Sequence, residues 1–247
     1  MNKEQILEQL RNDDEYYYGV GTQFISNSDI GTLLHNPRMF KVPSQKTPQM
    51  LQGNYFHTAI LEPEKLKHFV LVDASTRNTN IYKDAIKEHN ADYLMLKSEA
   101  DELEKSVEVL KQNKFLYSLV RANGNQFEVP FVGFIDGIPF KCKVDIHNPE
   151  SKNYDLKTTS SIDDFKYSCK KYNYDSQCWI YKQLTGLDME FIVIEKNSGR
   201  LGHFIPTYDF YESGMQKVFK ALENYKKFFA SDATEDVTQF YTEGYLF

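Results

Sequence analysis

Residues 138–146 read Ile-Pro-Phe-Lys-Cys-Lys-Val-Asp-Ile, and residues 154–158 read Tyr-Asp-Leu-Lys-Thr. Side chains of a β-strand alternate between its two faces, and both stretches alternate in this way, so the sequence predicts two neighbouring strands. A hairpin pairing of these strands would set Asp145 beside Asp155, with Lys157 on the same face as Asp155. The first strand would have an apolar face of Phe140, Cys142, Val144 and Ile146 and a polar face of Lys141, Lys143 and Asp145.

Two adjacent carboxylates repel each other, and burial makes their charges more costly still. They are stable together only with a cation or a proton between them, and Mg²⁺ prefers such oxygen ligands. We therefore predict a Mg²⁺ site at Asp145 and Asp155, which Mn²⁺ would also fill, with the Leu156 carbonyl as a third oxygen ligand. Such a metal polarises a phosphate, and Lys157 beside it would position the attacking water or hold its proton.

An Asp-x-Lys triplet on a strand is also a common surface ion pair, and a motif this short is rarely diagnostic on its own. The second aspartate, ten residues upstream on a matching strand face, favours the catalytic interpretation. The order of elements along the chain adds to it: helices, three strands, two helices, two strands and a last helix, which is typical of an α/β domain with a mixed sheet. The predicted strands are residues 127–134, 138–146, 154–158, 190–196 and 203–207, with a turn at Asn197-Ser198-Gly199 between the last two. The predicted helices are residues 49–61, 161–171, 175–185 and 210–229, with one starting at residues 26–29 and mostly helical structure over 79–121.

The composition excludes several classes of protein. The 247 residues carry a formal charge of −6, and 15% of them are aromatic, which argues against disorder. The three cysteines are unclustered and form no Cys-x-x-Cys pair, so neither a disulfide framework nor a four-cysteine zinc or iron–sulfur site is expected. No apolar run is long enough for a membrane span, and the charged N-terminus lacks a signal-peptide pattern, so we expect a cytoplasmic protein with no membrane association.

Several motifs together resemble one enzyme superfamily. The segment from Lys143 to Thr159 resembles the PD-(D/E)XK nuclease core, although Val144 stands where the family usually has proline. Residues 53–63 are similar to the helix motif that carries the family's metal-facing histidine, and Gln177-Cys178-Trp179-Ile180-Tyr181 resembles the Q-x-x-x-Y helix of the RecB-like branch. Residues 26–28 before a helix, followed by Asn36-Pro37, are similar to the opening of phage RecE-like and lambda-type exonucleases.

The resemblance implies a restriction-endonuclease-like α/β core, in which helices flank a central mixed β-sheet, preceded by an N-terminal helical segment. It implies a single nuclease domain over residues 1–247. Residues 1–123 would be mostly helical, residues 124–207 would contain the catalytic sheet and helices, and residues 208–247 would form a C-terminal helix and tail.

The resemblance also assigns roles, and each has a structural alternative. His57 would be a metal ligand, with Gly53 one turn earlier allowing another backbone to come close, or else a hydrogen-bonded core histidine. Glu128 would help bind the metal, or be a solvated strand carboxylate. Gln177 and Tyr181 share one helix face and would orient Lys157 or a phosphate, or simply pack that helix. Ser28 would bind DNA near a 5′-phosphate, or be an ordinary helix N-cap.

The implied function is a metal-dependent exonuclease that degrades duplex DNA ends 5′ to 3′ in phage-type recombination. A homo-oligomeric ring of three or four copies and a single-strand annealing protein as partner are implied as well, and the location would be the cytoplasm of a bacterial host if the chain is phage-encoded. A structure-specific or single-strand nuclease of the same fold, in repair or defence, is one alternative. A non-catalytic DNA-binding module is another, and the intact Asp145, Asp155 and Lys157 set argues against it.

Overall fold

A computed structural model describes residues 1–43, 46–196 and 198–243 of the chain. Its centre is a five-stranded mixed sheet in the order β3-β4-β5-β6-β7. The β5·β6 pair is parallel and the other three pairs are antiparallel. The strands are β3 (Gln126–Ile135), β4 (Ile138–His147), β5 (Asn153–Thr159), β6 (Met189–Glu195) and β7 (Leu201–Phe204).

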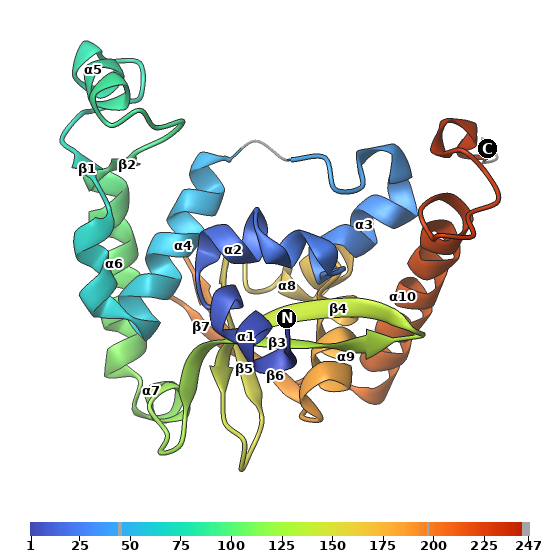
Figure 1. Cartoon of the computed structure of the whole chain (residues 1–247). Helices are drawn as coiled ribbons and strands as arrows, with labels where there is room; N and C mark the ends of the chain where they lie inside the picture. The colour runs from blue at the N-terminus through green and yellow to red at the C-terminus, as the bar shows by residue number, and fades with distance from the viewer. Residues whose placement is uncertain (44–45, 197, 244–247) are drawn as a thin grey trace.

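Helices cover both sides of this sheet, as Figure 1 shows, with α4, α6 and α7 to its left and α9 and α10 to its right. The first three helices are short and lie in the N-terminal part of the chain, where α1 packs against β3. These arrangements give the mixed α/β fold that the sequence predicts. The helices are α1 (Lys3–Leu10), α2 (Asp13–Tyr17), α3 (Asn27–His35), α4 (Pro48–Leu61), α5 (Asn80–Glu88), α6 (Lys97–Gln112), α7 (Lys114–Val120), α8 (Phe165–Lys171), α9 (Tyr174–Thr185) and α10 (Tyr208–Phe228), with 3₁₀ turns at Val20–Gln23, Pro37–Met39, Pro63–His68 and Val237–Gln239.

The main core lies between the sheet and the α4–α6–α7 side. The apolar residues Leu103, Val107 and Leu110 of α6 recur at helical spacing, so all three face this core. A second cluster joins α3, α9 and α10 to the β3–β4 hairpin. A third packs α8 and α9 on β6. Burial on both sides explains why the interior strand β6 contains the continuous apolar run Phe191–Ile194.

A small extension stands apart from the central sheet. Strands β1 (Leu71–Val72) and β2 (Met95–Leu96) form a separate parallel pair, and α5 lies between them in sequence. Figure 1 shows α5 projecting away from the main body. Its own apolar cluster is small and is centred on Val72, Tyr82, Leu94 and Leu96. The strand β2 is too short for its period to be visible in the sequence, and it was not predicted.

Two predicted elements, α8 and β7, have clearly different bounds in the structure. Helix α8 begins at Phe165 and not at Ser161, because the Ile162 N–H donates to Glu195 across the chain. Strand β7 covers Leu201–Phe204 and not residues 203–207, since Pro206 has no N–H for a sheet. The turn expected at residues 197–199 includes Asn197, which lies outside the described residues.

None of the helices in the described ranges is long and apolar enough to cross a membrane.

Candidate active site

Three carboxylates stand in one row across adjacent strands. Phe127 pairs with Ile146 and Val129 with Val144, which places Glu128 of β3 opposite Asp145 of β4. In the β4·β5 ladder Ile146 pairs with Tyr154, and one further step in the same register brings Asp145 opposite Asp155. The ladder between β4 and β5 ends at the Ile146–Tyr154 pair, so the two strands separate where Asp145 and Asp155 lie. Glu128 and Asp155 are 17 and 10 residues away from Asp145 in the sequence, and the sheet brings both next to it.

Glu128 sits in strained backbone. Its φ of +51° lies in the left-handed region, which is unfavourable for a residue with a side chain. The ladder between β3 and β4 is interrupted at this residue and at Asp145, while it continues on both sides. Strain of this kind costs of order 1–3 kcal/mol and concentrates at functional sites. The simple alternation predicted for this strand therefore breaks at its one acidic residue.

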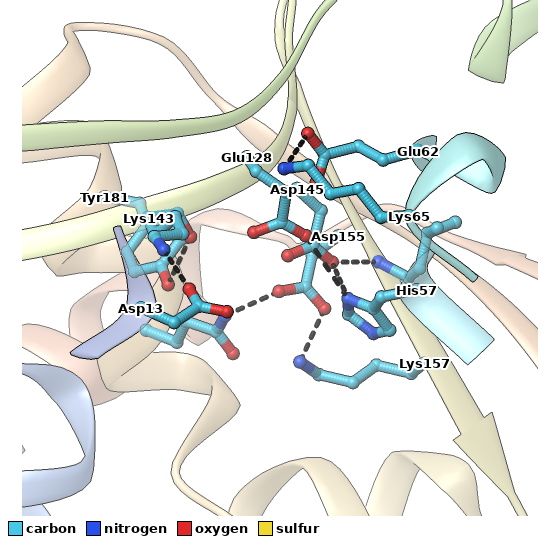
Figure 2. A network of polar contacts seen from close by, with 12 residues as sticks. Asp13, His57, Glu62, Lys65, Glu128, Lys143, Asp145, Asp155, Lys157 and Tyr181 are labelled. Carbon is cyan, nitrogen blue, oxygen red and sulfur yellow. Dashed lines mark hydrogen bonds and ion pairs between the residues drawn. The ribbon is translucent and has the colours of Figure 1, made fainter. Parts of the chain in front are cut away.

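His57 of α4 faces this row. Its Nδ1 lies 3.4 Å from Asp145 Oδ2 and 3.9 Å from Glu128 Oε1, and Figure 2 shows the three side chains pointing toward one another. One ligand atom from each of them lies within 4.8 Å of the others, which is close enough to hold one metal ion. Two carboxylates and an imidazole fit a divalent cation such as Mg²⁺ or Mn²⁺. Gly53 lies on the same helix, and a Cβ added there would meet no atom within 4 Å. The sequence predicts that another backbone comes close to Gly53, and this prediction is wrong for the described residues.

Asp155 is paired differently. Its Oδ2 lies 2.6 Å from the Lys157 Nζ, and its Oδ1 accepts a 2.6 Å hydrogen bond from Gln177 Nε2. Only 2% of the Asp155 side chain is exposed, so this ion pair is removed from water. The structure therefore groups Asp145 with His57 and Glu128, and groups Asp155 with Lys157 and Gln177. Figure 2 shows Asp145 and Asp155 side by side, so the two groups adjoin in one site.

A backbone N–H group of β5 forms a hydrogen bond to a carboxylate of the site. The Leu156 N–H donates a 2.8 Å hydrogen bond to Asp145 Oδ2. This bond ties the two strands together just where their ladder ends and fixes the orientation of the Asp145 carboxylate. The Leu156 carbonyl stays a predicted metal ligand.

Burial shifts the protonation of the carboxyl groups. It raises the pKa of Glu128 to about 8, and the charge of Asp145 adds to this rise. It also raises the pKa of Asp145 to about 6, against the opposing influence of His57. Raised pKa values at two neighbouring acids mark a place where negative charge is unfavourable, and a bound cation would relieve this.

Lys157 remains an ammonium group. Burial lowers its pKa, but the charge of Asp155 and the hydrogen bond to it reverse that effect, and the net pKa lies above the ordinary value. A lysine held in this way cannot accept a proton at neutral pH. It can orient a water and stabilise negative charge that develops beside it.

Tyr181 lies next to the site but acts on the backbone. Its hydroxyl donates a 3.1 Å hydrogen bond to the Lys143 carbonyl, which fastens α9 to β4. Its partner on the helix face, Gln177, orients the Asp155 carboxylate and only through it Lys157. The hydrogen bonds of these two side chains thus hold Asp155 and the backbone of β4 in place.

Ser28 lies in the first turn of α3 and is exposed. Its hydroxyl is 2.9 Å from that of Ser26, the residue that caps the helix. The carboxylate of Asp29 takes the hydrogen bonds of the Ser26 N–H and hydroxyl and pairs with Lys41 at 2.9 Å. This acid neutralises part of the positive end of the helix. The N-cap is Ser26, so the N-cap alternative for Ser28 is wrong, and the DNA-binding role of Ser28 stays a prediction.

Sequence reasoning missed the part of the site that comes from α2. Lys143 Nζ lies 2.5 Å from Asp13 Oδ1, and the ring of Tyr16 lies 4.7 Å from the same ammonium. Lys141, expected on an open polar face, is only 5% exposed because its ammonium donates to the Tyr16 carbonyl. Lys143 could have been found from its place on the Asp145 face. Nothing in the acidic stretch around Asp13 indicates that it folds onto β4.

Comparison with known proteins agrees with this fold. A crystal structure from Eubacterium rectale, provisionally described as an exonuclease, is similar with a TM-score of 0.63 at 16% identity, over 87% of this chain and 85% of that one. A phage-related exonuclease from Haemophilus somnus 129PT gives 16% identity over 63% of this chain and 88% of its own, but its TM-score of 0.32 supports no argument. Comparison with curated protein sequences gave no match.

A protein-family model matches residues 35–236, which include the whole sheet and His57. Its description is a PDDEXK-like domain of unknown function. The fold, the order of the motifs and this match lead to one assignment: the chain belongs to the PDDEXK-like family DUF3799.

Proposed function

We propose that the chain is a metal-dependent deoxyribonuclease that removes nucleotides from the ends of duplex DNA, 5′ to 3′, in phage-type recombination. The observation that carries this proposal is the meeting of Glu128, Asp145 and His57 within reach of one ion, beside the Lys157 ammonium held by Asp155. The provisional description of the Eubacterium rectale structure as an exonuclease supports the choice of an end-directed reaction.

Asp145, Glu128 and His57 would hold Mg²⁺ or Mn²⁺, with Asp155 and the Leu156 carbonyl as further oxygen ligands. When bound, such an ion polarises the phosphate and activates water. Lys157 keeps its positive charge beside the reacting phosphate and orients the attacking water. Gln177 fixes the Asp155 carboxylate, and Tyr181 fixes the backbone of β4, so both act by positioning.

The proposal extends to DNA contacts and assembly. Ser28, exposed at the start of α3, would contact the DNA near its 5′-phosphate. Copies of the chain would form a ring of three or four around the duplex, and a single-strand annealing protein would take up the strand that remains. Sedimentation of the purified protein checks the ring directly, since a monomer at micromolar concentration would contradict it.

A labelled duplex tests the reaction. Blunt duplexes with a 5′-phosphate or a 5′-hydroxyl, each labelled at one 3′ end, are incubated with Mg²⁺, with Mn²⁺ and with a chelator. We expect progressive shortening from the 5′ end, faster with the 5′-phosphate and absent with the chelator. Cleavage of closed circular DNA would instead support a structure-specific or single-strand nuclease, and the absence of any cleavage would overturn the proposal.

A further inference from the structure

The short helix α8 exposes a mixed basic and aromatic surface. Phe165 and Cys169 turn inward and pack in the cluster with β6, as their spacing of four residues requires. The other side of the helix is exposed. We call the exposed set the α8 stripe; it consists of Lys166, Tyr167, Lys170, Lys171 and the following residue Tyr172.

The α8 stripe is locally positive in a chain with a net charge of −6. Residues 165–174 contain three lysines and no acid. None of these three ammonium groups pairs with a carboxylate of the described residues, so their charges are available to a ligand. Lys166 lies 4.9 Å from the centre of the Tyr167 ring, and Lys171 lies 5.5 Å from that of Tyr172. Each of these two lysines therefore lies beside an exposed tyrosine ring, so a ligand can contact both.

Aromatic rings connect the α8 stripe to the catalytic lysine. The Lys157 Nζ lies 4.7 Å from the centre of the Tyr174 ring. That ring is 6.1 Å from the ring of Tyr172, and the two planes are tilted by 36°. Tyr172 is 56% exposed and Tyr167 66% exposed. The rings thus lead from the buried Lys157–Asp155 pair to open solvent over a short path.

We propose that the α8 stripe binds unpaired nucleotides next to the phosphate that is hydrolysed. The inference rests on the proposed nuclease function and specifies how one strand is held. Unpaired bases offer flat faces that stack on tyrosine, while lysines contact the phosphates between them. Bases inside a duplex are already stacked and offer no such face. The α8 stripe therefore distinguishes an opened strand from a closed duplex.

Binding measurements test the inference without turnover. A Lys157→Ala background prevents hydrolysis, and fluorescence anisotropy follows a labelled 12-nucleotide oligothymidylate and a blunt hairpin duplex. We expect Tyr172→Ala and Tyr167→Ala each to weaken binding of the single strand about tenfold, within the range for loss of one base stack, and to change duplex binding less than about twofold. Tyr172→Trp should keep the affinity. Tyr241→Ala removes a tyrosine that is 76% exposed in the C-terminal segment, and it should change neither affinity.

Salt dependence separates stacking from charge. Replacing Lys166, Lys170 and Lys171 by glutamine should lower the slope of log affinity against log salt by about 2, since each phosphate contact of a single strand contributes about 0.7. The tyrosine variants should leave that slope unchanged. Because all five side chains are exposed, circular dichroism melts of these variants should match the parent, which confirms that folding is intact.

The two proposals can fail separately. If the wild-type chain hydrolyses duplex ends but the tyrosine variants bind the single strand normally, the inference about the α8 stripe is wrong and the nuclease function stands. If no hydrolysis occurs while these variants lose affinity for the single strand only, the nuclease function is wrong and the stripe is a binding surface. Equal losses on single strand and duplex would also overturn the inference.

Discussion

A single ammonium group supplies the positive charge of the Asp155 part of the site. Lys157 lies 2.6 Å from the buried Asp155 carboxylate and is kept protonated by it. Its replacement removes the charge that would stabilise the reacting phosphate, while the Asp145, Glu128 and His57 group remains. Residue-scale changes here should therefore separate turnover from metal binding.

Lys157→Ala should reduce the rate of DNA hydrolysis at least about 10²-fold, the usual effect of removing one electrostatic group from a site of this kind. It also leaves Asp155 buried without its partner, which should lower metal-free stability by about 3 kcal/mol. Added Mg²⁺ should still raise the melting temperature. Hydrolysis assays and thermal melts of the variant and of Lys157→Arg check both effects, and near-normal rates in Lys157→Ala would contradict the mechanism.

Glu128 should make the metal-free protein less stable as the pH rises. Burial raises its pKa to about 8, above the value of about 4.3 in an unfolded chain, so the folded state holds the proton more tightly. This contribution is full below the unfolded pKa and is lost as the pH rises through the folded one. In a chelator, urea unfolding between pH 5 and 8.5 should show a fall on the order of 2 kcal/mol.

The matched variant for that measurement is Glu128→Gln, which is uncharged at every pH. Its stability should fall less between pH 5 and 8.5 than that of the wild type. Mg²⁺ at pH 8 should stabilise the wild type by about 2.7 kcal/mol at one hundred times its dissociation constant, and the same Mg²⁺ concentration should stabilise the variant less. Identical pH profiles for the two proteins would show that Glu128 is not the buried acid described above.

Two helical glycines have different surroundings, so adding one methyl group should change the stability of the protein differently at each. At Gly53 in α4 an added Cβ meets nothing within 4 Å, whereas at Gly214 in α10 it would lie 2.1 Å from the Asp175 carbonyl oxygen. Helix interiors favour alanine over glycine by roughly 0.5–1 kcal/mol. The same substitution should therefore have opposite signs in the two elements.

We expect Gly53→Ala to raise the free energy of unfolding by roughly 0.5–1 kcal/mol and Gly214→Ala to lower it by about 1–3 kcal/mol, because α9 and α10 would have to move apart. Urea unfolding of both variants checks the signs. If Gly53→Ala destabilises the chain, then the open space beside α4 is filled in solution.

The whole molecule consists of a central part with a large apolar core and an extension with a small apolar cluster. The extension, residues 70–96, has two-residue strands and a small cluster around Tyr82, whose hydroxyl bridges the Leu94 N–H and carbonyl. The interior strand β6 is buried along almost its whole length. Local opening needs less free energy where fewer apolar contacts are lost, so the two parts should open independently.

Native-state hydrogen exchange should show this difference. Amides of α5 should exchange at a lower opening free energy than those of β4 and β6, and Tyr82→Phe should accelerate exchange in α5 and β2 alone. Peptide-resolved mass spectrometry measures both. Uniform acceleration across the sheet in Tyr82→Phe would mean that the extension and the central sheet unfold as one unit.

Asp145, Asp155 and Lys157 were placed together from local sequence, because strand alternation is a short-range rule, whereas His57 and Glu128 came from the family resemblance. Alternation along residues 138–146 and 154–158 set Asp145 near Asp155, and the helix start predicted at residues 26–29 contains Ser26, the N-cap of α3. The spacing of Gln177 and Tyr181 placed both on one face of α9. These rules act within a few residues, so they hold whatever the rest of the chain does.

Only the tertiary structure decided how those residues combine. The sequence determined the strands, the main helices and the acidic and basic groups available for chemistry, since these follow from periodicity and residue type. It did not determine that β4 and β5 separate beside Asp145, that Glu128 adopts a positive φ, or that Asp13 folds onto Lys143 from 130 residues away. Such features depend on which surfaces pack together, and packing energy is shared among residues far apart in the chain.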